Sequence, residues 1–208
     1  MAHTNVNIRL ERQSDHDTVE RVTFAAFESF EAPGMPKRDI PNEHFLVSLL
    51  RGDPEFVPEL DFVAELDGEI VGNIMYSKCG VVRPDGTITD ALTFGPVSVL
   101  PKYQRQGIGI QLIRHSLERA LALGYKAVII TGHTTYYPRF GFVPADTFGL
   151  TTQDGSTFDA FMALELEPGY LGSAGGKWKC CAAFDVCEND KTAFMEYHRQ
   201  YVLKQTEY

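Results

Sequence analysis

A glycine-containing loop over residues 102–110 carries the clearest chemical signal in the sequence. It holds Gly107 and Gly109, and an amphipathic segment over residues 110–121 follows it at once. Glycine lets a backbone approach a ligand closely, and a helix N-terminus presents free N–H groups and the positive end of its dipole. An anion such as a pyrophosphate is favoured at such a place. An ordinary tight strand-to-helix loop is the alternative for these residues.

Two well-known nucleotide motifs do not fit this loop. No Gly-Lys-Ser/Thr sequence follows it, so it is not a P-loop. Leu112 stands where the third glycine of the dinucleotide-binding fingerprint would be. A mononucleotide-binding α/β protein is therefore less favoured, although this interpretation stays open.

A tyrosine-rich segment over residues 136–142 is the second candidate for chemistry. A tyrosine hydroxyl can give a proton to a leaving thiolate, because both groups have alkaline reference pKa values. Tyr136 and Tyr137 are the candidates, and a buried, hydrogen-bonded tyrosine is the alternative for each. We expect Phe140 and Phe142 to anchor the core.

The elements that position these segments follow from hydrophobic periodicity and turn residues. Asp67-Gly68 predicts a tight hairpin. Pro96 predicts that its strand bulges or leaves its neighbour near residues 95–96, because proline cannot donate to a strand ladder. The order strand, helix, strand around the glycine loop predicts a parallel pair. The fold class is α+β, with a mixed, mostly antiparallel sheet flanked by helices. We expect strands over residues 5–10, 61–66, 69–78, 88–100, 125–131 and 158–166, and helices from Ser14 and over 42–51, 110–121 and 189–203.

Composition narrows the class of protein. The 208 residues carry a formal net charge of −9, which argues against a nucleic-acid-binding surface. No apolar run approaches the roughly 18 residues of a membrane span, and no secretory signal is visible at the N-terminus. The four cysteines, Cys79, Cys180, Cys181 and Cys187, are expected to be reduced and structural in a cytoplasmic protein.

Together the two segments resemble the GNAT superfamily of acetyl-coenzyme A-dependent N-acetyltransferases. Residues 104–109 (QRQGIG) match the family's Gln/Arg-x-x-Gly-x-Gly/Ala loop. Tyr137 stands four residues before Gly141, as in the family's Tyr-x-x-x-Gly-Phe pattern. Residues 95–99 occupy the place of the family's bulged fourth strand, and residues 132–142 resemble a bacterial branch with a Tyr-Tyr-x-Arg-Phe-Gly-Phe motif. The resemblance covers residues 5–166 and implies a GNAT-like fold in which parallel strands 4 and 5 splay apart.

The resemblance implies roles for individual residues. Tyr137 would protonate the departing coenzyme A thiolate after direct attack by a primary amine, with no covalent enzyme intermediate and no metal. The peptide N–H near Val97 would polarise the thioester carbonyl. The pantetheine arm would pair with the backbone of Val97 and Val99, as an added strand does. The loop residues that would hold the pyrophosphate of acetyl-coenzyme A are Gln104, Arg105, Gln106, Gly107, Ile108, Gly109 and Ile110.

The general base and the acceptor stay open at this point. His133 is a candidate base at the end of the fifth strand, and its reference pKa suits the task. Glu28, Glu31 and Asp90 are further candidates, with a structural histidine and solvated surface charges as the alternatives. The partner is a small-molecule or peptide amine, with neither nucleic acid nor membrane involved.

Residues after Pro168 extend beyond the resemblance. We expect a GNAT-like acetyltransferase domain over residues 1–167 and a C-terminal extension over 168–208. Its aromatic residues are too many for a disordered tail, so it should pack on the core or on a second subunit of a homodimer. A non-catalytic acyl-coenzyme A sensor or regulatory binding module is the alternative function for the whole chain.

Overall fold

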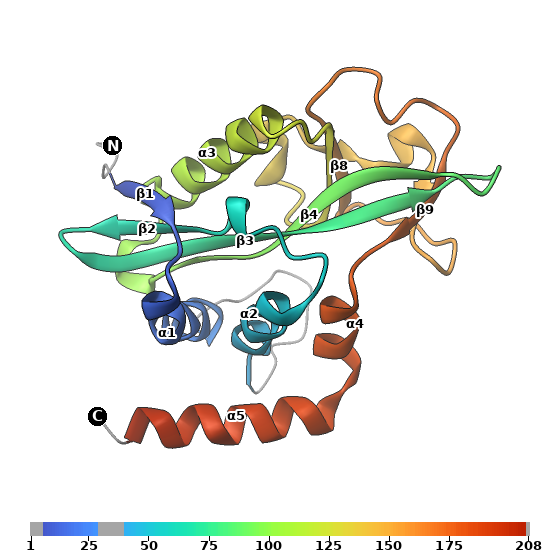
Figure 1. Ribbon diagram of the computed structural model, residues 1–208. Helices are drawn as coiled ribbons and strands as arrows, with labels where there is room; N and C mark the ends of the chain where they lie inside the picture. Colours follow the sequence, from blue (N-terminus) through green and yellow to red (C-terminus); the bar gives the residue numbers. More distant parts are fainter. Residues whose placement is uncertain (1–5, 29–39, 207–208) are drawn as a thin grey trace.

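The computed structural model describes residues 6–28 and 40–206, which form one nine-stranded sheet with helices on both faces (Figure 1). The strands are β1 (Asn7–Leu10), β2 (Phe62–Leu66), β3 (Glu69–Val82), β4 (Ile88–Val99), β5 (Ala127–Thr131), β6 (Val143–Pro144), β7 (Leu150–Thr151), β8 (Phe161–Glu165) and β9 (Gly176–Lys179). The α-helices are α1 (His16–Glu28), α2 (Glu43–Gly52), α3 (Ile108–Ala122), α4 (Ala182–Asn189) and α5 (Lys191–Thr206).

The sheet is mixed and mostly antiparallel, as expected. Its main path runs β1-β2-β3-β4-β5-β8-β6, and β9 joins the edge of β3. Strands β4 and β5 run parallel, and Leu92 opposite Val128 is their registered pair. The short strands β7 and β9 also run parallel to each other.

Two local predictions from turn chemistry are confirmed. Asp67 and Gly68 take φ values of 51° and 82°, as a type I′ hairpin requires. The β3–β4 register shifts between Ile74 and Tyr76, whose partners Val97 and Phe94 enclose Gly95 and Pro96. Strand β4 therefore carries one extra residue at this point, which is the expected bulge.

Other elements differ from the prediction. A 3-10 turn over Gln13–Asp15 precedes α1, and the Asp15 carboxylate accepts the Arg12 N–H at 2.8 Å. The sequence from Ser14, with Asp17 three residues on, predicts a capping box, and this prediction is wrong, because the Asp15 carboxylate already occupies the helix entry. The C-terminal segment forms two helices, α4 and α5, instead of one, and Asp190 separates them.

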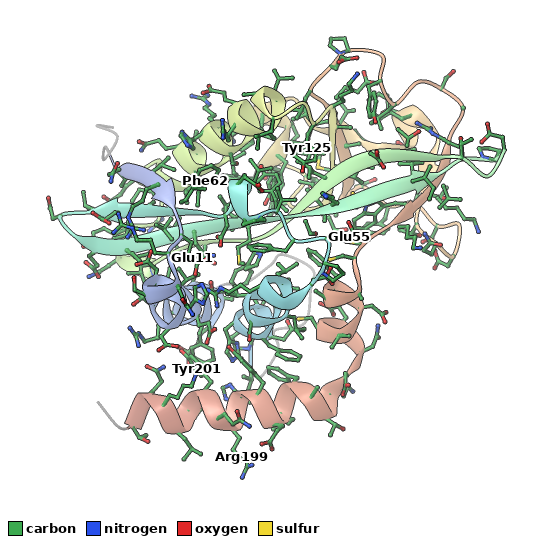
Figure 2. The ribbon with its side chains drawn as sticks, viewed as in Figure 1. Glu11, Glu55, Phe62, Tyr125, Arg199 and Tyr201 are labelled. Atoms are coloured by element: carbon green, nitrogen blue, oxygen red, sulfur yellow. The ribbon has the colours of Figure 1, made fainter. Side chains whose placement is uncertain are left out.

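The helices divide between the two faces of the sheet. Helix α3 covers one face, while α1, α2 and α4 cover the other, and α5 lies across α1 and α2 (Figure 1). On α5, Tyr201 points toward α1 and α2, whereas Arg199 points away (Figure 2). The extension thus reaches the core through both β9 and α5, while the boundary at residue 167 stays a prediction. Among residues 6–28 and 40–206, no helix combines the length and apolar character that crossing a bilayer demands.

Candidate active site

The loop between β4 and α3 ends in an open helix N-terminus. Gly107 precedes the first residue of α3 with a φ of 87°, and Arg105 also has a positive φ, of 60°. The N-cap residue of α3 is Gly107, which has no side chain to fill the space in front of this first turn. Backbone N–H groups in such left-handed turns form concave anion sites, and the helix dipole adds positive potential. The loop can therefore hold a diphosphate through its backbone.

Leu92 opposite Val128 is the one registered pair of β4 and β5 among the described residues, although β4 continues to Val99 and β5 to Thr131; the space between the two strands beyond this pair is called the wedge. The edge of β4 beside the loop faces this wedge. Leu100 donates its N–H to Val71 O of β3 at 2.9 Å. Main-chain groups of an antiparallel strand alternate in direction, so those of Val99 and Val97 point away from β3 and toward the wedge. Gln104 already donates to Val99 O at 3.0 Å. The other main-chain groups on this edge suit pairing with an extended ligand.

The Tyr137 ring lies between Gly132, just after the end of β5, and Phe94 of β4. It packs on Gly132 so closely that a Cβ at that position would collide with ring atoms Cε2 and Cδ2. The centres of the Phe94 and Phe142 rings lie 5.8 and 5.7 Å from the centre of the Tyr137 ring. Burial raises the pKa of Tyr137 above its usual value, and Tyr136 adds to the effect. The hydroxyl is therefore protonated near neutral pH, as a proton donor must be.

Tyr136 connects the tyrosine segment to the glycine loop. A Cβ built on Gly109 would lie 3.1 Å from the Tyr136 hydroxyl oxygen, so this phenol reaches the N-terminus of α3. The Arg139 guanidinium lies 4.5 Å from the centre of the Tyr136 ring, and Arg139 Nε donates to Tyr136 O at 2.9 Å. From the sequence, Tyr136 and Tyr137 are both candidates for the proton donor. The structure places the Tyr136 hydroxyl at Gly109 and the Tyr137 ring against Gly132.

The candidate bases are spread out. His133 is exposed after the end of β5, and its Nδ1 accepts the Thr135 N–H at 3.3 Å. Thr135 Oγ1 also lies 3.0 Å from Nδ1, so both polar groups of Thr135 engage the same ring nitrogen and Nε2 is the one left outside this turn. Asp90 lies on the opposite side of the Leu92–Val128 pair from the bulge, away from the wedge. Glu28 is exposed at the end of α1, and Glu31 falls outside the described residues.

Phe184 lies beside the bulge of β4, a position that sequence reasoning missed. It belongs to α4 of the extension, and its ring atoms lie 3.7 and 3.9 Å from a Cβ built on Gly95 at the bulge. A substituted residue at the bulge would therefore touch this ring on the face of the sheet that bears α1, α2 and α4. No local pattern reports a contact between residues so distant in sequence.

A hollow of about 930 Å³ lies elsewhere, at the C-terminal end of α3 and the opening residues of β4. Its lining includes Ile88, Asp90 and Gly124, and none of the loop residues 104–110. It is therefore separate from the wedge. Among residues 6–28 and 40–206, no group of three or more histidine, cysteine or acidic side chains could hold a metal ion.

Comparisons with known proteins agree with this geometry. Residues 59–144 match the model of the acetyltransferase (GNAT) domain. The uncharacterized N-acetyltransferase YjhQ of Escherichia coli is 36% identical over 100 residues, which are 48% of this chain and 54% of YjhQ, so the match spans about half of that relative. The crystal structure of the GNAT family N-acetyltransferase YhbS from Escherichia coli in complex with CoA has 26% identity and a TM-score of 0.73, over 88% of this chain and 96% of YhbS.

A third relative covers nearly the whole fold. The crystal structure of a GNAT family acetyltransferase from Brucella melitensis in complex with acetyl-CoA has 30% identity and a TM-score of 0.65. The alignment takes in 88% of this chain and 100% of that protein. With the mixed sheet, the bulged β4 and the open N-terminus of α3, these matches place the chain in the GNAT family of N-acetyltransferases.

Proposed function

We propose that the protein transfers an acetyl group from acetyl-coenzyme A to a primary amine. The observation that carries this proposal is the N-terminus of α3, which begins at a left-handed glycine, Gly107, beside the wedge between β4 and β5. Two relatives with the same fold were solved with CoA or acetyl-CoA. The cytoplasm stays the expected compartment, as a prediction from the sequence alone.

The residues around the wedge fit this co-substrate. Backbone N–H groups from Arg105 to Ile110 would hold the diphosphate, and the close approach of Tyr136 to Gly109 leaves no room there for a larger side chain. Main-chain groups of Val97 and Val99 would pair with the amide-containing arm. The arm would then run along β4 to the bulge at Gly95-Pro96, where the thioester would lie.

Transfer at the bulge needs two proton movements. The amine nitrogen attacks the thioester carbonyl, a C–N bond forms, and the C–S bond breaks. The N–H near Val97 would polarise the carbonyl oxygen. Tyr137 would give its proton to the departing sulfur. The attacking amine must lose a proton, and the candidate acceptors are His133 and solvent water.

The amine would enter from the face of α1, α2 and α4. Phe184 lies over Gly95 on this face, so it would form part of the pocket wall. An aromatic wall favours an acceptor with an apolar body behind its amine, as in an aralkylamine or a peptide side chain. Both a small molecule and a peptide fit this description.

The direct experiment combines binding with turnover. Acetyl-coenzyme A should raise the melting temperature of the full chain, whereas ATP and NAD should not. A panel of amines should then be tested for loss of the thioester's ultraviolet absorbance. Stabilisation without turnover on any amine would favour an acyl-coenzyme A sensor, and stabilisation by ATP or NAD alone would refute the assignment.

Tyr137→Phe tests the proton donor. The change removes one oxygen and keeps the ring, so we expect kcat to fall roughly 10- to 1,000-fold with little change in acetyl-coenzyme A affinity. Tyr136→Phe is the matched control for loss of a tyrosine hydroxyl. It should keep its kcat, because the Tyr136 hydroxyl lies at Gly109 and not at the bulge where the thioester would lie. A wild-type kcat in Tyr137→Phe would remove this residue from the mechanism.

A further inference from the structure

Three buried polar side chains join helix α1 to the sheet next to the bulge of β4. Thr23 Oγ1 of α1 donates a hydrogen bond to Asn73 Oδ1 of β3 at 3.2 Å. Ser98 Oγ of β4 donates to Thr23 Oγ1, also at 3.2 Å. The exposed fractions of Thr23, Asn73 and Ser98 are 0%, 0% and 1%, so water does not reach them. We call these three residues the polar bridge.

The polar bridge lies in apolar surroundings. Val63 of β2 is registered opposite Asn73 and belongs to a buried cluster with Met75 of β3. Asn73 Nδ2 has no hydrogen-bond partner among the described residues. A buried donor without a partner costs free energy, and an apolar side chain of similar shape would avoid that cost. Stability alone therefore does not account for these side chains, and exceptions of this kind are typical of functional sites.

Ser98 belongs to the part of β4 that faces the wedge. It stands between Val97 and Val99, whose main-chain groups would pair with the coenzyme arm. The Ser98 side chain points to the face of α1, whereas the side chains of Val97 and Val99 pack against the buried cluster on the α3 side. Ser98 thus connects the main chain at the proposed thioester site to α1.

Residues 97–99 form a short piece of strand after a bulge, so their position needs support. On one edge they pair with residues 72–74 of β3. On the other edge, Leu92 is the one registered contact with β5 in the described part of the chain, and it comes before the bulge. The polar bridge adds an anchor from outside the sheet, because α1 packs on the face of β3 and β4 (Figure 1).

We propose that Thr23 is a positioning residue for acetyl transfer. Through Ser98 it fixes residues 97–99 relative to α1, so the main chain that pairs with the arm and polarises the thioester is in place before the coenzyme arrives. Thr23 itself touches no reacting atom, because the strand lies between it and the wedge. This inference rests on the proposed function, since the segment that it positions is the one that would hold the thioester.

Thr23→Val tests the polar bridge, because valine has nearly the shape of threonine but lacks the hydroxyl. Substitutions in a coupling network change binding or rate by about 2- to 30-fold. We expect kcat to fall and the dissociation constant of acetyl-coenzyme A to rise, each within this range, while KM for the amine changes little. Thr23→Ser keeps the hydroxyl and should restore both values. Rates of thioester loss and calorimetry with acetyl-coenzyme A measure the two effects.

Ser116→Ala is the matched control for loss of a buried hydroxyl. Ser116 lies on α3, on the other face of the sheet, with its Oγ 2.8 Å from Tyr76 Oη. This variant should lower the melting temperature as Thr23→Val does, and it should keep the wild-type kcat. Ser98→Ala removes the strand end of the bridge, so adding it to Thr23→Val should cause little further loss. If Thr23→Val does not fold, Ser98→Ala takes its place in the test.

The outcomes separate this inference from the proposed function. A folded Thr23→Val variant with wild-type kcat and coenzyme affinity would overturn the role of Thr23, and so would a Thr23→Ser variant that is equally impaired. An equal loss of kcat in Ser116→Ala would overturn it as well, because lowered stability would then explain the effect. If the wild-type chain binds acetyl-coenzyme A but acetylates no amine, the change in affinity alone decides. A wild-type chain that does not bind acetyl-coenzyme A would refute the proposed function, and this inference with it.

Discussion

Gly132→Ala tests whether the position of Tyr137 controls acetyl transfer. A Cβ at residue 132 would overlap Tyr137 Cε2 and Cδ2 and would lie 3.2 Å from Ile130 Cδ1. Restoring ordinary contact requires the tyrosine ring to move by about 1 Å, and a misplacement of that size can lower a rate about 100-fold. We therefore expect kcat to fall about 100-fold. Crowding of the site should also lower the free energy of unfolding by about 1 to 3 kcal/mol.

Gly52→Ala is the matched control for this change. Nothing lies within 4 Å of a Cβ at Gly52, the last residue of α2, so the variant should keep its activity. Its free energy of unfolding should change by no more than about 1 kcal/mol, in the stabilising direction. Both variants should be compared by initial rates of thioester loss, acetyl-coenzyme A calorimetry and thermal unfolding.

A double mutant separates displacement of the hydroxyl from general damage. If Gly132→Ala acts through the Tyr137 hydroxyl, adding it to Tyr137→Phe should cause little further loss of kcat. A folded Gly132→Ala variant with wild-type kcat would refute the reasoning. Full additivity of the two changes would refute it as well, because the alanine would then act by another route.

Two further predictions concern Phe184 of the extension and His44 of α2, whose Nε2 lies 3.1 Å from His198 Nδ1 of α5. Phe184→Ala should widen the space on the acceptor side of the bulge, because the Phe184 ring lies beside Gly95. The KM for amines with an apolar body should rise, while the affinity for acetyl-coenzyme A stays constant. Equal effects on every amine would argue against Phe184 as a wall of the acceptor pocket. Burial, with a smaller contribution from His198, lowers the pKa of His44 to about 4, so between pH 6.5 and 4 the unfolded chain binds a proton that the folded chain excludes. The free energy of unfolding should therefore decrease as the pH is lowered from 6.5 to 4, by at most about 3 kcal/mol. His44→Leu should flatten this pH dependence, measured by urea titrations at each pH. An unchanged dependence in the variant would assign it to other groups.

Local sequence signals predicted much of the fold. The Asp67-Gly68 turn and the bulge at Pro96 each depend on residues adjacent in sequence, and both are confirmed, because left-handed φ values and a missing N–H donor act on neighbouring residues. The parallel order of β4 and β5 is confirmed as well, and it follows from the single helix, α3, that connects the two strands. The end of the chain was harder to predict. Residues 176–179 form a strand only because the edge of β3 is available, and no periodicity over four residues reports that.

In the site, too, local features could be predicted from the sequence and contacts between distant residues could not. The spacing of Gly107, Gly109 and Tyr137 predicts the loop and the tyrosine from the sequence alone. The sequence could not show that Gly132 leaves room for the Tyr137 ring, nor that Phe184 crosses from the extension to Gly95. The role of His133 stays a prediction, since its hydrogen bond with Thr135 depends on the turn after β5.

Strand β3 has a consequence for synthesis on the ribosome. Its first half pairs with β2 and its second half with β9 along one edge, so two distant parts of the chain complete a single strand. While the polypeptide is being made, Gly80–Val82 have no partner on this edge until residues 176–179 have emerged. An exposed strand edge invites pairing with other nascent chains, so chaperones that bind extended segments would have their longest opportunity here.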